Sequence, residues 1–182
     1  MRNATNYGNG ALKVTVVGIE ENVAMCNKLR NLDLTRWFAD DAAPIVRNRL
    51  KAIIERGVDH ERWPALHPFT LENKTGRGMM IETGRLIKSI SSITGESIFT
   101  IDRTSMEIGS KLPYAAIHNE GGKIRVTPKM RSFLHIQGLH LKQTTKFIKI
   151  PKREYLFISK PMENSLYTSL YGFIQDIINS FE

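Results

Sequence analysis

The chain has 182 residues, of which 41% are hydrophobic and 24% are charged, and its formal net charge is +8 at pH 7. This size suits one domain with a real core and is short for two. No apolar run approaches the roughly 18–20 residues that span a bilayer, and residues 1–10 lack the apolar stretch of a secretory signal. Because Cys26 is the single cysteine, an intrachain disulfide is excluded. We therefore expect a soluble protein that does not enter a membrane.

The first third of the chain predicts a flexible segment, a strand and a helical region. Residues 1–10 are polar and rich in Asn and Gly, so we expect them to be flexible or loosely attached. Residues 11–19 alternate apolar and polar side chains, which indicates a strand. Residues 34–55 carry apolar side chains at helical spacing.

The ends and the middle of that helical region carry their own signals. The Asp33 carboxylate can accept the free backbone N–H groups of the first turn. Pro44 removes a backbone donor and crowds the preceding turn, so we expect a kink or break there, with Asp40 or Asp41 capping a second piece. Gly57 is expected to end the helix.

The middle of the chain predicts a short helix and a hairpin. The helix is expected over residues 79–91, with Gly84 inside it for a packing reason. Residues 97–102 and 105–109 indicate two strands joined by a tight turn. Residues 114–119 fit a short helix and an extended segment equally well.

The last third predicts more strands and one long helix. Residues 123–127, 133–136, 147–150 and 155–158 indicate strands, with a polar, basic loop over 138–145. Apolar residues then recur at intervals of four and three from Met162 to Phe181, with Pro161 in the first turn, which predicts an amphipathic helix.

This order of elements predicts an α+β fold. We expect a small antiparallel sheet packed with N-terminal and C-terminal helices, and a basic β-hairpin or loop extension. No internal repeat and no linker divides residues 11–182, so they are expected to form a single domain after the flexible residues 1–10.

The excess positive charge lies in one segment. From Lys123 to Arg153 there are nine basic residues and no Asp or Glu, whereas the rest of the chain has 17 basic and 18 acidic residues. A positive electrostatic potential concentrated on one element predicts contact with an acidic partner or with nucleic acid. A solvated, lysine-rich hairpin that resists edge aggregation would have the same composition, and both interpretations stay open. The nine residues are Lys123, Arg125, Lys129, Arg131, Lys142, Lys146, Lys149, Lys152 and Arg153.

No catalytic, cofactor-binding or metal-binding residues are expected. The five histidines do not form a zinc-binding pattern, and lysines and arginines surround His135 and His140. A nucleophile elbow is absent, and residues 75–78 are too short for a phosphate-binding loop. The motifs of common nucleic-acid-binding folds are also missing. The sequence therefore indicates a protein that is not an enzyme.

Four short blocks in the middle of the chain resemble the phage virion morphogenesis family, the Mu-like tail-completion proteins. They occur in the family's order over residues 58–158, and the third is similar to the family's Tyr-Ala-x-x-His-x-x-Gly-Gly. The blocks depart from the pattern at Glu154, where the family often has Pro, at Tyr155, where it often has Phe, and at Glu61-Arg62, where it favours Gly. The four blocks are Glu61-Arg62-Trp63-Pro64-Ala65-Leu66 with Thr70 and Lys74; Thr83-Gly84-Arg85-Leu86-Ile87-Lys88-Ser89-Ile90; Ile108-Gly109-Ser110 with Tyr114-Ala115-Ala116-Ile117-His118-Asn119-Glu120-Gly121-Gly122; and Val126-Thr127-Pro128-Lys129-Met130-Arg131 with Ile150-Pro151-Lys152-Arg153-Glu154-Tyr155-Leu156.

The block residues are expected to serve the architecture of the domain. Trp63 and Leu66 can anchor the irregular segment around them by burying large apolar area. Gly121 and its neighbour permit positive φ in a turn. Gly84 permits close approach of another backbone, and Arg153 can form a directional ion pair that fixes the strand end.

The resemblance implies a structural protein of a phage or prophage that acts in virion assembly, in tail completion or head–tail joining. Its implied partners are copies of itself in a ring and other tail or neck proteins. Its implied location is the virion, and the host bacterial cytoplasm during assembly. The basic segment would then protrude towards a neighbouring subunit, an acidic partner or packaged DNA. Two alternatives are a basic nucleic-acid-binding protein that uses residues 123–153, and a small hydrolase with an unrecognised site.

Overall fold

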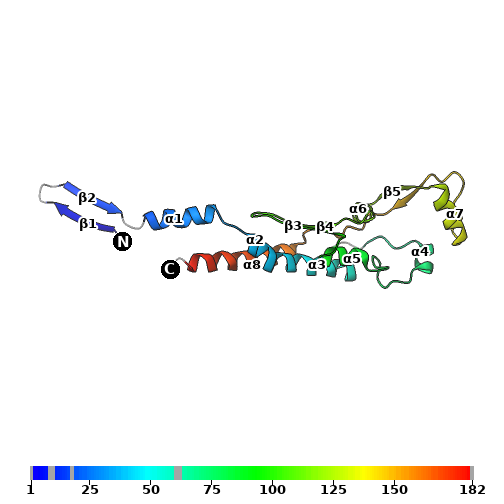
Figure 1. The fold of residues 1–182 in the computed structure, drawn as a ribbon, viewed down its shortest axis with the longest axis horizontal. Coiled ribbons are helices and arrows are strands. Elements are labelled where there is room, and N and C mark those ends of the chain that lie inside the picture. The colour runs from blue at the N-terminus through cyan, green and yellow to red at the C-terminus, as the bar shows by residue number, and fades with distance from the viewer. Residues whose placement is uncertain (1, 8–10, 17–18, 60–62, 181–182) are drawn as a thin grey trace.

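A computed structural model describes residues 2–7, 11–16, 19–59 and 63–180. The chain is elongated, with the N-terminal elements at one end and helix α7 (Pro128–Ile136) at the other (Figure 1). Strand β1 (Arg2–Tyr7) pairs with β2 (Ala11–Val16) in an antiparallel ribbon, so residues 2–7 have regular structure that the sequence did not predict. Residues 17–18 of the predicted strand, Glu61-Arg62 and Phe181 lie outside the described residues.

The helical region begins and ends where its capping residues predict. Helix α1 (Ile19–Arg30), which the sequence did not predict, precedes it, and α2 (Thr35–Trp37) opens it. The Thr35 amide donates to Asp33 Oδ1 at 2.9 Å, as predicted for this carboxylate, although Leu34 occupies the N-cap position. Helix α3 (Ala43–Arg56) ends at Gly57, whose φ of 64° lets its amide bond to the Ile53 carbonyl at 2.8 Å.

The predicted irregularity near Pro44 is a π-helical turn. Element η1 (Phe38–Ala42) joins α2 to α3, and Pro44, which has no N–H to donate to the preceding turn, lies at the start of α3. The prediction that Asp40 or Asp41 recaps the second piece is wrong. Because the backbone stays helical through η1, no side chain caps α3.

Two short helices flank a turn in the next segment. Helix α4 (Pro68–Asn73) was not predicted, and its His67 cap accepts the Phe69 amide through Nδ1 at 3.2 Å. Helix α5 (Arg85–Ser91) starts later than predicted. Gly84 is its N-cap residue with φ at 76°, a conformation that favours glycine, and is not an interior residue of the helix.

The strands form separate two-stranded ribbons and do not join into the predicted sheet. Strands β3 (Ser97–Ile101) and β4 (Met106–Ser110) form the predicted hairpin. Helix α6 (Ala115–Glu120) follows, which decides between the two possibilities for residues 114–119. Strand β5 (Gly122–Arg125) pairs with β6 (Phe147–Ile150). With β1–β2, the described residues thus contain three antiparallel ribbons, and the fold is mixed α+β.

Two of the predicted strands are wrong. Residues 133–136 belong to helix α7, which the Thr127 hydroxyl caps by accepting the Met130 amide at 3.1 Å. Residues 155–158 have no strand partner, because the amides of Tyr155 and Leu156 both donate to the Asn119 side-chain oxygen, at 3.1 and 2.9 Å. The long C-terminal helix is confirmed as α8 (Lys160–Asn179).

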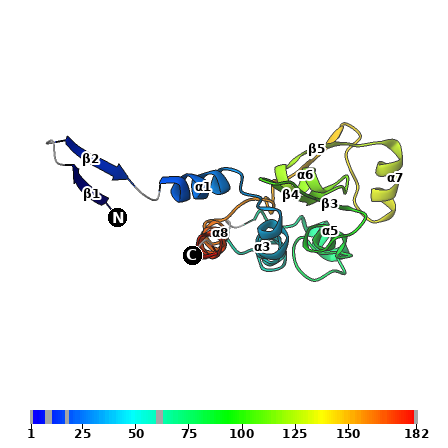
Figure 2. The ribbon, with the colours of Figure 1, turned by 60° about the vertical axis from the view of Figure 1, so that its left-hand side comes forward.

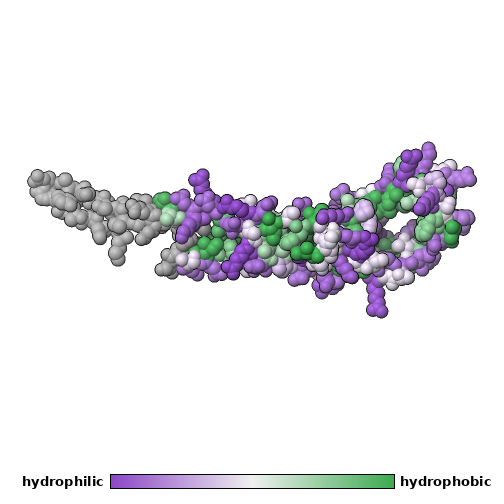
Figure 3. All heavy atoms as spheres, viewed as in Figure 1, coloured by the Kyte–Doolittle hydropathy of each residue, from purple (hydrophilic) through white to green (hydrophobic). Residues whose placement is uncertain are grey.

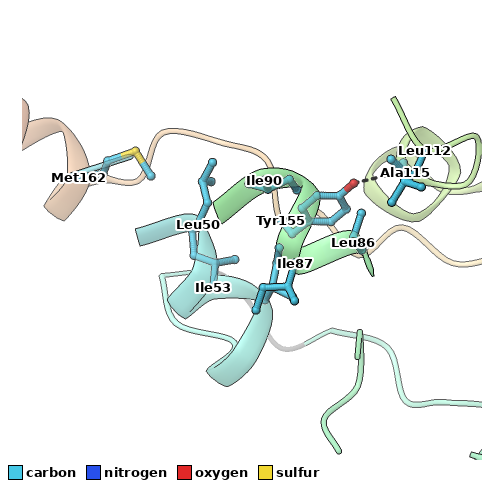
Figure 4. Close-up of a cluster of buried hydrophobic side chains, with 10 residues drawn as sticks. Leu50, Ile53, Leu86, Ile87, Ile90, Leu112, Ala115, Tyr155 and Met162 are labelled. Carbon is cyan, nitrogen blue, oxygen red and sulfur yellow. Dashed lines mark hydrogen bonds between the residues drawn. The ribbon is translucent and has the colours of Figure 1, made fainter. Parts of the chain in front are cut away.

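The core lies between α3, α5, α6 and the start of α8. Figure 2 shows α3, α5 and α8 along one side of the β3–β4 ribbon. Ile53, Ile90 and Tyr155 are buried at its centre, and Trp63 packs against it with its indole N–H on the Glu154 carbonyl at 3.0 Å. This contact confirms the anchoring role predicted for Trp63 (Figure 4 shows the core). Among the described residues no helix is long and apolar enough to cross a membrane.

Candidate interaction surfaces

The basic segment forms a projection from the body of the protein. Strands β5 and β6 pair in register from Gly122 opposite Ile150 to Arg125 opposite Phe147. The Val126 amide continues the pairing to the Lys146 carbonyl at 2.9 Å. Helix α7 and the loop over 137–146 close its end (Figure 1). We call residues 122–152 the basic extension.

Seven of the nine predicted contact residues are exposed on this projection. Of these, Lys152 pairs with the Glu154 carboxylate at 2.8 Å. The seven exposed residues are Lys123, Arg125, Lys129, Lys142, Lys146, Lys149 and Lys152. Their side chains are available to an acidic surface, and no acidic residue lies between them in the sequence.

Arg131 has a structural role at the end of the basic extension. Its guanidinium donates to the carbonyls of Leu141, Lys142 and Thr145, at 3.1, 2.8 and 2.6 Å. These bonds hold the loop against α7. Because its donors are used within the chain, Arg131 is less suited to partner contact than the exposed lysines.

Arg153 is buried at the base of the extension. Its Nε and Nη2 donate to the Pro64 carbonyl at 3.1 and 2.9 Å, and Nη2 also donates to the Ala65 carbonyl at 3.0 Å. The predicted ion pair is therefore wrong, because backbone carbonyls accept the guanidinium protons. Burial lowers the pKa of Arg153. The side chain joins two segments that are 88 residues apart and is far less exposed to a partner than the seven residues above.

The four sequence blocks converge on one pocket, which the sequence did not predict. The cavity has a volume of about 580 Å³. Leu66, Thr70 and Lys74 come from the first block, and Thr83 to Leu86 from the second. The third and fourth blocks also reach it. They contribute Tyr114, His118 and Arg153.

Glu82 organises one wall of this pocket. Its carboxylate accepts the Thr75 hydroxyl at 2.6 Å and the amides of Thr75 and Gly76 at 3.1 and 3.2 Å. It also accepts the Lys74 ammonium at 3.0 Å. The hydrogen bonds from Thr75 and Lys74 lower the pKa of Glu82 to about 2. Glu82 is thus charged over the whole physiological range and fixes the loop over 74–82.

Two further ionisable groups line the pocket, Arg85 and His118. Arg85 forms an ion pair with the Glu96 carboxylate. Desolvation, with the nearby charge of Arg153, lowers the pKa of His118, so its ring is neutral at pH 7. His118 Nδ1 is buried and makes no hydrogen bond to any described residue. No group of three or more His, Cys, Asp or Glu side chains in the described part of the chain could hold a metal ion.

A second, apolar groove lies between η1, β4, residues 156–158 and α8. Its volume is about 330 Å³. Trp37 is fixed in the wall of the groove by its indole N–H, which donates to the Ser169 hydroxyl on α8 at 2.9 Å. Phe38, Ile108 and Phe157 also line the groove. The sequence did not reveal it, because its walls come from four separate parts of the chain.

The sequence profile of the Phage virion morphogenesis family matches residues 35–171, which include both pockets and the basic extension. The chain belongs to this family, and its role is therefore in phage virion assembly. Neither the curated proteins nor the solved structures give a significant match.

Proposed function

We propose that this chain completes the phage tail or joins head to tail, by self-association and by binding other virion proteins. The observation that carries the proposal is the basic extension, a projecting ribbon and helix with seven exposed cationic side chains, on a chain of the virion morphogenesis family. Projections of one charge sign favour contact with a complementary surface. The protein acts in the virion, and in the host cytoplasm while particles assemble.

The exposed lysines set the kind of partner that the extension accepts. Lys142, Lys146 and Lys149 are exposed and make no ion pair with the described residues. An acidic face of a neighbouring virion protein satisfies them, and so does the phosphate backbone of packaged DNA.

Neutralising these three lysines tests the proposal. The change Lys142→Gln, Lys146→Gln and Lys149→Gln is expected to lower the yield of infectious particles, because it removes the charges that a partner would meet. If the partner is DNA, the salt dependence of binding should also fall, with a slope smaller by roughly two to three. Particle yield by plaque count and DNA retention in purified particles measure the two effects.

The matched control removes the same charge elsewhere. Lys51, Lys88 and Lys111 are also exposed and lie outside the extension. Their replacement by Gln should leave yield and DNA retention unchanged. Normal yield and normal retention in the extension variant would contradict a role for this surface.

Nucleic-acid binding through the basic extension is the second candidate. The same exposed cations favour it. A gel shift with DNA at micromolar protein that weakens as salt rises, and that is lost in the triple Gln variant, would support it.

A further inference from the structure

We propose that copies of this chain associate head to tail, with the exposed apolar side chains of α7 of one copy inserted into the apolar groove of the next. This inference rests on the self-association in the proposed function and names the two surfaces that make it. The occupant is a second copy of the same chain.

The tip of the basic extension carries an exposed apolar stripe. Phe133 is 58% exposed and Ile136 is 79% exposed, although both are large hydrophobic residues. They lie three residues apart on α7 and therefore share a face, with Lys129 one turn before Phe133. Exposed apolar residues that cluster on one projecting element are typical of a docking surface.

The groove offers a matching recess. Its lining is largely apolar, and Leu156 and Ile158 at its edge are 36% and 70% exposed. Large side chains from a partner would cover these residues and the groove floor beneath them. A volume of about 330 Å³ is at the lower end of the range for binding pockets, which suits a few side chains better than a whole helix.

Charge favours the tip of another copy as the occupant. Asp40 and Asp41 are exposed on η1, the same turn that supplies Phe38 and Ala42 to the groove. The Asp40 carboxylate forms an ion pair with Arg36 at 3.5 Å, whereas Asp41 makes no ion pair with the described residues. The tip has cations and no carboxylate. Beside the groove, Arg36 is paired with Asp40 and Lys160 with Glu163, which leaves the Asp41 carboxylate to complement the positive, apolar projection.

The two surfaces lie apart in the molecule, so the tip of one copy cannot reach the groove of the same copy. Figure 1 places α7 at one end of the molecule and α2 near its middle, and η1 directly follows α2 in the chain. Figure 3 shows hydrophobic residues gathered on α7 and, separately, in the middle of the molecule. Contact between the tip of one copy and the groove of another joins different patches, so it propagates and closes into a ring where the rotation allows.

Two variants separate the two halves of the contact. Phe133→Asp with Ile136→Asp alters the tip, and Ile158→Asp alters the groove. All three positions are exposed, so folding should be preserved. Ile93→Asp is the matched control, because Ile93 is 68% exposed in the turn before β3 and lies outside both surfaces.

Analytical ultracentrifugation of the full chain gives the readout. The wild type and Ile93→Asp should form oligomers, and the tip and groove variants should each be monomeric, with affinity weakened about tenfold or more. Mixing the two variants in equal amounts should produce a dimer and nothing larger. The groove variant keeps an intact tip and the tip variant keeps an intact groove, so one contact forms between them. The altered tip and the altered groove that remain cannot bind a third copy.

Two results would overturn the head-to-tail contact. One is a wild type that stays monomeric at concentrations up to roughly a hundred micromolar, because its self-association would then be far weaker than specific assembly requires. The other is a failure of the two variants to complement each other: the mixture stays monomeric, or one variant alone still associates, as a groove-to-groove contact predicts for the tip variant and a tip-to-tip contact for the groove variant. Neither result bears on the virion role, which particle assembly in the absence of the chain tests separately.

Discussion

Replacing Tyr155 with Ala is expected to lower the free energy of unfolding by about 3–5 kcal/mol. The side chain is only 1% exposed and lies among residues of α3 and α5 (Figure 4). Its hydroxyl donates to the Ala115 carbonyl at 2.9 Å, which ties the segment after the basic extension to α6. Burial raises the pKa of Tyr155 to about 12, so the hydroxyl keeps its proton and remains a donor at any physiological pH.

One further substitution separates the contribution of the ring from that of the hydroxyl, and a second serves as a control. Tyr155→Phe keeps the packing and leaves the Ala115 carbonyl without its donor, which should cost about 1–2 kcal/mol. Tyr167→Ala alters an exposed tyrosine on α8 and should change stability by less than about 0.5 kcal/mol. Urea denaturation followed by circular dichroism measures all three. Equal losses for Tyr155→Ala and Tyr167→Ala would contradict the placement of Tyr155 in the core.

Replacing Arg153 with Met is expected to destabilise the protein by about 2–3 kcal/mol. The guanidinium satisfies the Pro64 and Ala65 carbonyls, and a thioether cannot donate to them. Arg153→Lys should restore only part of the loss, because a single ammonium lacks the planar fork that reaches both carbonyls. The midpoint and slope of denaturant unfolding give the change in free energy.

Lys152 supplies the control for Arg153. It is the preceding residue and carries the same charge, but it is exposed and pairs only with Glu154. Lys152→Met should change stability by less than about 0.5 kcal/mol. If Arg153→Met is as mild as Lys152→Met, Arg153 does not join the two segments.

The sequence predicts helices best where capping and periodicity agree. The C-terminal helix has both an apolar period and Pro161 in its first turn, and the structure confirms it. Helix α7 was missed because Phe133, Leu134 and Ile136 suggest a strand when they are considered alone. The Thr127-Pro128 pair before them is a helix start signal, and it outweighs strand propensity in so short a segment.

The candidate surfaces were predictable to different degrees. Composition alone located the basic extension, because charge is a property of the sequence. It could not show that Arg131 and Arg153 donate to backbone carbonyls, since those carbonyls lie elsewhere in the chain. The motif-lined pocket and the apolar groove arise only when separate segments meet. The flexibility of residues 1–10 and the single domain over residues 11–182 stay predictions.

The most direct test of the role in virion assembly is to delete the gene for this chain from the phage or prophage that encodes it. Electron microscopy of the lysate should then show heads and tails that are not joined, or tails left incomplete, and plaque formation should be lost. Expressing the wild-type chain from a plasmid should restore intact particles. Intact, infectious particles in the absence of the chain would contradict the assignment.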